Sequence, residues 1–139
     1  FFGGLLPLVR VHDGEFGRSS AGRLLIESIW LPACLTPDRG ALWHPGDDHR
    51  CTVRLPGQAE ITSLNMTVAE SGALIDVSMM RHQGGEANNF GLMPFGIRVE
   101  KEKQFGDFTV PSEVSAIWGY GTDDADEFMR IKVEDARFL

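Results

Sequence analysis

The sequence predicts an α+β fold in which a highly curved antiparallel β-sheet, arranged as a half-barrel meander, wraps around one kinked helix. Residues 22–37, GRLLIESIWLPACLTP, carry the helix signal and are apolar around almost the whole circumference of that helix. After residue 40 the chain alternates between apolar and polar positions, which is typical of strands with one exposed face. Because each long strand has one apolar face, the sheet cannot lie between two layers and must curl over the helix.

Length and charge limit the possible architectures and partners. The 139 residues fit a single half-barrel-like domain, 1–139, with one hydrophobic core. The chain starts without Met and with a strand-like composition, so we expect it to be a piece of a longer protein. Its net charge of -7 opposes binding to nucleic acid and to anionic lipid surfaces. We therefore expect no nucleic-acid partner.

The sequence also indicates a location and a redox state. No apolar run reaches the ~20 residues that span a bilayer, and the start, FFGGLLPLV, lacks the basic flank and cleavage pattern of a signal peptide. We expect no membrane span and a cytoplasmic location. Cys34 and Cys51 make neither a disulfide framework nor a metal-binding knuckle, so we expect two buried thiols in a reducing compartment. A single disulfide bond between them is the alternative.

The first expected elements are a strand and the helix. The strand covers 5–12, LLPLVRVH, and Pro7 places it at an edge of the sheet, where a missing amide donor is tolerated. The helix follows within 17–35. Pro32 removes a backbone amide and clashes one turn back, so the helix should kink or restart at Trp30–Leu31.

Two pairs of strands come next. Short strands at 41–44 and 50–55 are joined by the turn sequence PGDD. Longer strands at 60–70 and 73–81 form a hairpin. Their inward positions are Leu64, Met66 and Val68 on the first strand and Ala73, Ile75, Val77 and Met79 on the second. Pairing even-numbered with odd-numbered positions requires a connecting loop of even length.

A third hairpin covers 95–118 and should close at Gly106–Asp107. That closure sets Val99 opposite Val114, Ile97 opposite Ala116 and Phe95 opposite Trp118. A last strand at 127–139 should be half buried, with Met129, Ile131 and Val133 facing inward. Residues 82–93 are an irregular loop. The sum is one helix followed by a meander of antiparallel strands, with an extra strand before the helix.

The helix carries the first candidate for chemistry. Arg23 and Glu27 are four residues apart, so their side chains meet on one face. Glu27 also has Leu24, Trp30 and Leu31 as neighbours at helical spacing, and a carboxyl group in such apolar surroundings sometimes serves as a general acid. The alternative is an ion pair on the solvent side of the helix.

Three other patterns have simpler interpretations. The segment WHPGDDHRC holds His44, Asp47, Asp48, His49 and Cys51, which are possible metal ligands. Alternation directs the cysteine inward and the turn uses both aspartates, so we expect no metal site and no cofactor. GRSSA at 17–21 is a near miss of a nucleophile elbow, which needs a parallel sheet that the sequence does not predict. Arg98, Glu100 and Glu113 form a solvated charge ladder, with Arg98 diagonal to Glu113.

Large apolar side chains gather on the predicted inner face. They are Trp30, Trp43, Met66, Met79, Phe95, Trp118 and Met129. They either fill the core or line a cleft for a flexible apolar ligand, since methionine lines adaptable surfaces. The candidate ligand-binding residues are Arg23, Glu27, Trp30, Trp43, Phe95 and Trp118.

The sequence resembles an uncharacterised, mostly bacterial family of domains of unknown function. Members carry a helix of the form R-x-L-x-E-x-x-W-x-P-x-x-L-x-P, then a W-x-x-x-D-D turn, then strands ending in V-P and W. The matching positions here are Arg23, Leu25, Glu27, Trp30, Pro32, Leu35 and Pro37 in the helix, Trp43, Asp47 and Asp48 in the turn, and TVPSEVSAIW at 109–118. The family usually has further strands upstream of residue 1.

The resemblance implies a half-barrel similar to the lipoprotein carriers of the LolA-like class, in which a curved sheet closed by helices holds an acyl chain. We therefore expect a non-enzymatic binding module for an apolar or amphipathic, lipid-like ligand, without a catalytic residue. The alternatives are a small enzyme with Glu27 as acid or base and a purely structural or assembly domain. An open sheet edge at 5–12 or elsewhere also predicts a homodimer formed by strand addition.

Overall fold

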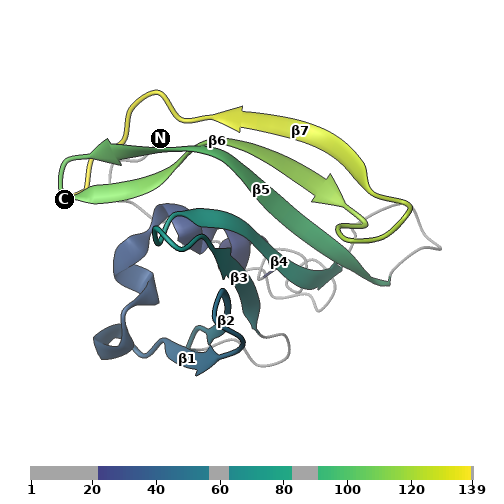
Figure 1. Cartoon of the computed structure of the whole chain (residues 1–139), viewed down its shortest axis with the longest axis horizontal. Helices are drawn as coiled ribbons and strands as arrows, with labels where there is room; N and C mark the ends of the chain where they lie inside the picture. The colour runs from purple at the N-terminus through teal and green to yellow at the C-terminus, as the bar shows by residue number, and fades with distance from the viewer. Residues whose placement is uncertain (1–21, 57–62, 83–90, 139) are drawn as a thin grey trace, which may run out of the picture.

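A computed structural model describes residues 22–56, 63–82 and 91–138, and these contain a seven-stranded antiparallel sheet. The strands are β1 (Leu42–Pro45), β2 (Arg50–Arg54), β3 (Leu64–Val68), β4 (Leu74–His82), β5 (Leu92–Phe105), β6 (Phe108–Trp118) and β7 (Asp126–Lys132). Each strand pairs with the next one in the chain, so β1 and β7 form the two edges and the sheet does not close (Figure 1). The expected strand at 5–12 and the near-miss elbow at 17–21 lie outside the described residues.

The seven strands correspond one to one to the strand ranges expected after the helix, from 41–44 to 127–139. The two short segments flanking the PGDD turn each form a separate strand, and they pair along their length, from Leu42 opposite Arg54 to Pro45 opposite Cys51. The turn makes this possible because the Gly46 amide donates a hydrogen bond to the Arg50 carbonyl oxygen, 2.9 Å away. Both short strands therefore belong to the same continuous sheet.

The register of β5 and β6 confirms the prediction made from the apolar positions. Phe95 lies opposite Trp118, Ile97 opposite Ala116 and Val99 opposite Val114. The turn needs Gly106, whose φ of 62° lies in the left-handed region that favours glycine. One irregularity at Lys101 interrupts the pairing and sets Lys101 opposite Glu113. Arg98 still lies opposite Ser115, two positions from Glu113, but the Glu113 side chain pairs with Lys101.

The β3–β4 hairpin keeps the predicted pairing in its body and departs from it near the turn. Met66 lies opposite Val77, as parity requires, but a bulge between Thr67 and Val68 shifts the pairing there. Val68 consequently lies opposite Leu74. The prediction that a loop of even length joins the two strands is therefore wrong. The bulge also affects Ile75, which was expected to face inward and is 43% exposed.

The helical part is shorter than expected and is broken where expected. Residues 22–27 are α-helical, and three 3₁₀ turns follow: η1 (Ser28–Trp30), η2 (Pro32–Leu35) and η3 (Pro37–Arg39). Leu31 interrupts the series with φ -126° and ψ 68°. Proline disfavours the helical region for the residue before it, so Pro32 explains this break. The predicted restart at Trp30–Leu31 is confirmed.

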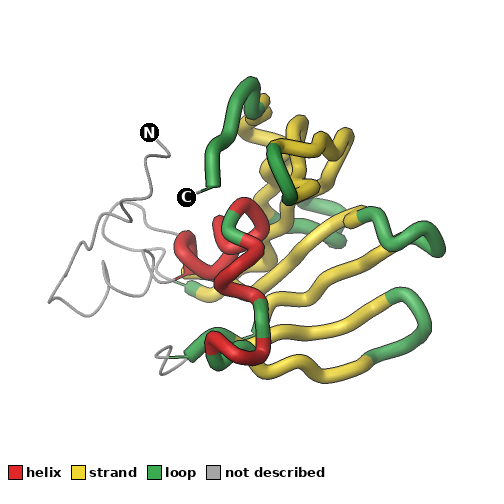
Figure 2. Tube along the Cα trace, turned by 90° about the vertical axis from the view of Figure 1, so that its left-hand side faces the viewer, coloured by secondary structure: helices red, strands yellow, loops and turns green. Residues whose placement is uncertain are grey.

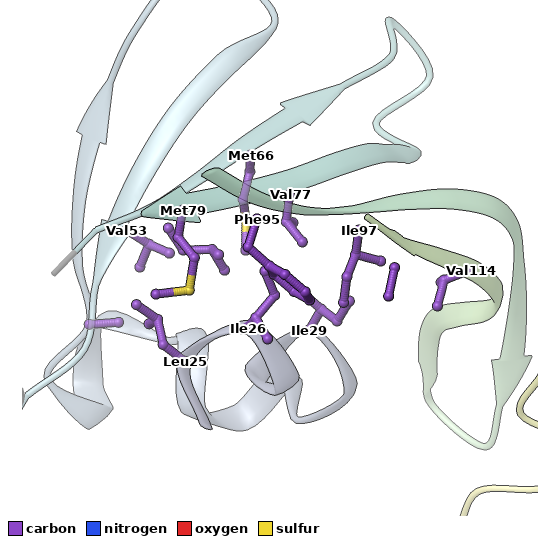
Figure 3. Close-up of a cluster of buried hydrophobic side chains, with 13 residues drawn as sticks. Leu25, Ile26, Ile29, Val53, Met66, Val77, Met79, Phe95, Ile97 and Val114 are labelled. Atoms are coloured by element: carbon purple, nitrogen blue, oxygen red, sulfur yellow. The ribbon is translucent and has the colours of Figure 1, made fainter. Parts of the chain in front are cut away.

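One hydrophobic core joins the helical segment to the sheet. The helical segment contributes Leu25, Ile26 and Ile29, all nearly inaccessible to solvent. The sheet side of the same cluster consists of Val53, Leu64, Met66, Val77, Met79, Phe95, Ile97, Val114 and Ala116, and Ala41 completes it. Figure 3 shows these side chains converging from both sides, and Figure 2 shows the helical turns lying beside the strands.

Both edge strands are more exposed than the alternation predicts. Trp43 on β1 is 39% exposed and Met129 on β7 is 45% exposed, so their predicted inward positions are wrong. Ile131 is the residue of the predicted inner face of β7 that packs against the core. An edge strand lacks a neighbour on one side, so its apolar side chains have less protein above them. The last strand is therefore mostly exposed rather than half buried.

Candidate functional site

Arg81, near the end of β4, is a charged residue on the buried side of the sheet. Alternation along β4 places Arg81 on the same side as Val77 and Met79, which are 0% and 3% exposed. The arginine itself is half buried. An inward cation at this position needs a structural or functional explanation, because charged side chains are seldom buried without a partner.

Two aromatic rings lie next to the Arg81 guanidinium group. Its central carbon is 4.9 Å from the centre of the Phe95 ring and 5.4 Å from the Trp118 ring. The sheet register produces this arrangement, since Phe95 pairs with Met79 on one side and with Trp118 on the other. Both distances are within the range of a cation–π interaction.

Phe128 extends this aromatic surface toward solvent. Its ring centre lies 6.1 Å from that of Phe95 and 6.2 Å from that of Trp118, and the residue is 46% exposed. In the pairing of β6 with β7, Met129 lies opposite Ala116 and Glu127 opposite Ile117, which leaves Phe128 as the extra residue of a bulge. Bulges redirect side chains in this way. We call Phe95, Trp118 and Phe128 the aromatic wall.

The polar surroundings of Arg81 are incomplete. Its Nε atom is buried and has no hydrogen-bond partner. Burial lowers the pKa of Arg81, Arg23 lowers it further, and Glu27 acts in the opposite direction. Gly22 at the start of the helical segment touches the arginine stem, because a Cβ atom there would lie 3.0 Å from Cγ of Arg81. Among the described residues, Arg81 makes no ion pair.

Arg23 and Glu27 form the ion pair that their spacing predicts. The Arg23 Nε atom donates to Oε1 of Glu27 over 2.7 Å, and the side chains are 69% and 38% exposed. Leu24, one of the expected apolar neighbours, is 49% exposed. This geometry is that of an ion pair on the solvent side of the helix, and it leaves one face of the carboxylate open to water.

The two other tryptophans among the candidate residues lie in different contacts. The Trp30 indole N–H donates to the Pro111 carbonyl oxygen over 2.9 Å, which ties η1 to β6. The Trp43 indole N–H donates to the Leu35 carbonyl oxygen over 2.8 Å at the β1 edge. The structure thus gathers Arg23, Glu27, Phe95 and Trp118 around Arg81, and it does not gather Trp30 and Trp43 with them.

Sequence reasoning missed Arg81 and Phe128. The signal for Arg81 was present, because its odd number places it with the inward positions of the strand at 73–81. A charge on an inward position of an otherwise apolar strand face is the pattern to look for. Phe128 carried no comparable signal, since its orientation depends on a bulge in the strand pairing.

The opposite face of the sheet carries an ordered polar cluster. The Tyr120 hydroxyl donates to Oδ2 of Asp76 over 2.8 Å, and burial together with this bond raises the pKa of Tyr120 to about 12. Arg98 bridges Glu100 and Glu127, which also binds Arg130. Of the expected charge ladder, Arg98 and Glu100 form an ion pair. Its predicted third member, Glu113, pairs with Lys101 instead.

A separate groove lies at the other end of β4. It has a volume of about 490 Å³, and its lining residues are Asp47, Asp48, His49, Arg50, Thr67, Val68, Ala69, Glu70 and Ile75. Ile75 and Arg81 are six positions apart on β4, so groove and arginine are separated by roughly 20 Å. The groove contains none of the candidate ligand-binding residues.

Other features bear on metal, redox and membrane chemistry. In the described ranges 22–56, 63–82 and 91–138, no three His, Cys, Asp or Glu side chains converge as metal ligands. Cys34 and Cys51 are free thiols, and both are half buried where buried thiols were expected. Burial raises the pKa of Cys51. No helix in the part of the chain that the structure describes is long and apolar enough to cross a membrane.

Comparison with known proteins gives one family-level result. Residues 2–131 match the model of a family of unknown function (DUF6544). Searches of curated proteins and of solved structures found no match. The expected resemblance to an uncharacterised family is therefore confirmed at that level.

Proposed function

Because the chain belongs to this family of unknown function, we propose its function from its own residues: it is a non-enzymatic half-barrel module that binds an amphipathic, lipid-like ligand. The observation that carries this proposal is the aromatic wall beside Arg81, which joins an apolar surface to a half-buried cation. Binding sites for small ligands commonly combine an apolar wall with few polar groups that fix orientation.

The half-barrel is supported by the shape of the sheet and by the position of the helical segment. The sheet bends along its length while the helical turns lie beside one face (Figure 1). Leu25, Ile26 and Ile29 share a core with residues from β2 to β6. In such an arrangement the ends of the strands form the mouth of the half-barrel, and Arg81 and the aromatic wall lie near one such end.

The aromatic wall is suited to the apolar part of the ligand. Phe95 is 3% exposed, and Phe128 is 46% exposed, so the wall runs from the core to solvent. A ligand that covers the exposed Phe128 ring buries apolar surface without displacing any core side chain. An alkyl chain that covers this ring would gain roughly 25 cal/mol per Å² of apolar surface removed from water.

Titration with dodecanol and with dodecanoate, followed by tryptophan fluorescence, tests the proposal. We expect saturable binding of at least one of them, and Phe128→Ala should weaken it about fivefold, since a side chain of that size contributes on the order of 1–3 kcal/mol when covered. Met80→Ala is the matched control, because Met80 is also 46% exposed but points to the opposite face of β4.

Two results would contradict the proposal. The first is the absence of saturable binding for both amphiphiles, which would favour the structural or assembly role. The second is equal weakening by Phe128→Ala and Met80→Ala, because equal losses would mean that exposed apolar area in general, and not the aromatic wall, takes up the amphiphile.

A further inference from the structure

We infer that Arg81 is the residue that binds the head group of the ligand and that it selects a singly charged oxyanion, such as a carboxylate, over a neutral or cationic head group. This inference rests on the proposed function and specifies its ligand class. It is carried by the donors of Arg81, by the geometry of the aromatic contacts and by the charge balance around the arginine.

Arg81 carries a hydrogen-bond donor that has no acceptor in those parts of the chain that the structure describes. The buried Nε atom of Arg81 lacks a partner, and no carboxylate among the described residues forms an ion pair with the guanidinium group. Placing a charged group away from water without a partner is costly, and arginine stays protonated in proteins. A ligand carboxylate at the guanidinium group supplies the counter-charge that the described part of the chain does not.

The N–H donors of Arg81 lie in the plane of its guanidinium group. Phe95 and Trp118 lie 4.9 Å and 5.4 Å from the guanidinium carbon, and an aromatic ring interacts with the charge without accepting the in-plane N–H bonds. The N–H groups along the edge of the guanidinium plane match the two oxygens of a carboxylate. The rings therefore hold the cation in place, and its edge is left to bind an anion.

Among the described residues, two cations and one acidic group act on the charge of this site. The cations are Arg81 and Arg23, and the acidic group is Glu27, whose carboxylate is already bound to Arg23 at 2.7 Å. The site is thus locally positive in a chain with a net charge of -7. One positive charge in excess suits one negative charge on the ligand and repels a cationic head group.

The inference is tested by comparing three amphiphiles of equal chain length, below their micelle concentrations. Dodecanoate, dodecanol and dodecyltrimethylammonium are titrated into the wild-type chain, Arg81→Gln and Arg54→Gln. Arg54 is exposed on β2 outside the site and controls for the loss of one positive charge. We expect the wild type and Arg54→Gln to bind dodecanoate roughly tenfold or more tightly than dodecanol, and Arg81→Gln to lose this preference.

The outcomes separate this inference from the proposed function. Equal binding of dodecanoate and dodecanol by the wild type overturns the anion selectivity and leaves the binding module intact. Absence of binding for every amphiphile overturns the proposed function itself. If Arg81→Gln does not fold, the wild-type ratio still decides between selectivity and its absence. A preference that persists in a folded Arg81→Gln variant also overturns the role of Arg81.

Discussion

Arg81 is a charged residue on the side of β4 where its neighbours Val77 and Met79 are apolar. On β4, Val77 and Met79 are buried as apolar inward positions should be, and Arg81 continues the same side with a charge. Its stem fits against Gly22 while its charged end reaches the aromatic wall. Sequence spacing could identify Arg23 and Glu27 because helical neighbours are fixed by local geometry. Sequence spacing could not predict that Arg81 lies near these two residues, since that proximity depends on how the helical segment docks on the sheet.

Tyr120 provides a residue-scale prediction, because it is the single tyrosine of the chain. Burial and the Asp76 bond raise its pKa to about 12, against a usual value of about 10. A pH titration of tyrosinate absorbance in the folded protein should therefore have its midpoint near 12. The stability gained from protonated Tyr120 is fully present below about pH 10 and is lost as the pH rises through the folded value.

Asp76→Asn is the matched variant for this titration. It should lower the pKa of Tyr120 only in part, because burial is the largest cause of the shift and remains. A wild-type midpoint close to the usual tyrosine value, with folding verified by circular dichroism, would show that Tyr120 is not held against Asp76.

Gly96 gives a second residue-scale prediction. A Cβ atom at Gly96 would lie 2.2 Å from Cγ of Tyr120, so Gly96→Ala must displace the ring and its bond to Asp76. We expect a loss of about 1–3 kcal/mol in the free energy of unfolding. Gly91→Ala is the control, since no atom of the described residues, its chain neighbours aside, lies within 4 Å of the added carbon. Equal stability of the two variants in urea denaturation would contradict the placement of Tyr120.

At the scale of elements, strand pairing could be predicted further than helix length. The register of β5 and β6 could be predicted because the inward apolar positions are odd-numbered on β5 and even-numbered on β6. A slip of one residue would turn every apolar side chain of a strand outward. The bulges at Thr67 and Ala116 could not be predicted in this way, and they account for the misplaced Ile75 and the missed Phe128. The alternation of odd and even positions describes regular strand pairing, whereas a bulge depends on contacts beyond the two strands.

The docking of the helical segment on the sheet predicts different effects for two adjacent leucines. Leu25 is 0% exposed and lies in the core, whereas Leu24 is 49% exposed. Leu25→Ala should cost about 2–5 kcal/mol of unfolding free energy, and Leu24→Ala should stay within about 0.5 kcal/mol. Denaturant melts of both variants measure these losses. Small losses in both variants would mean that the helical segment does not pack against the sheet.

At the scale of the whole molecule, the described sheet is open and has two edges. β1 carries Leu42, which is 61% exposed, and β7 carries Phe128 and Met129. Exposed edges offer unpaired backbone groups to another strand. The homodimer formed by strand addition remains a prediction, and sedimentation velocity at tens of micromolar should find a dimer. A monomer at that concentration, with rapid amide exchange in both edge strands, would contradict it.

The location of the ligand is the most direct test of the proposed half-barrel module. Amide chemical shifts of the labelled protein, measured during titration with dodecanoate, distinguish the two ends of β4, which lie roughly 20 Å apart. We predict saturable shifts at Arg81, Phe95, Trp118 and Phe128, where the cation meets the aromatic wall. Shifts confined to the groove lined by Asp47–Arg50 and Thr67–Glu70, or no saturable shifts at all, would contradict the proposed site.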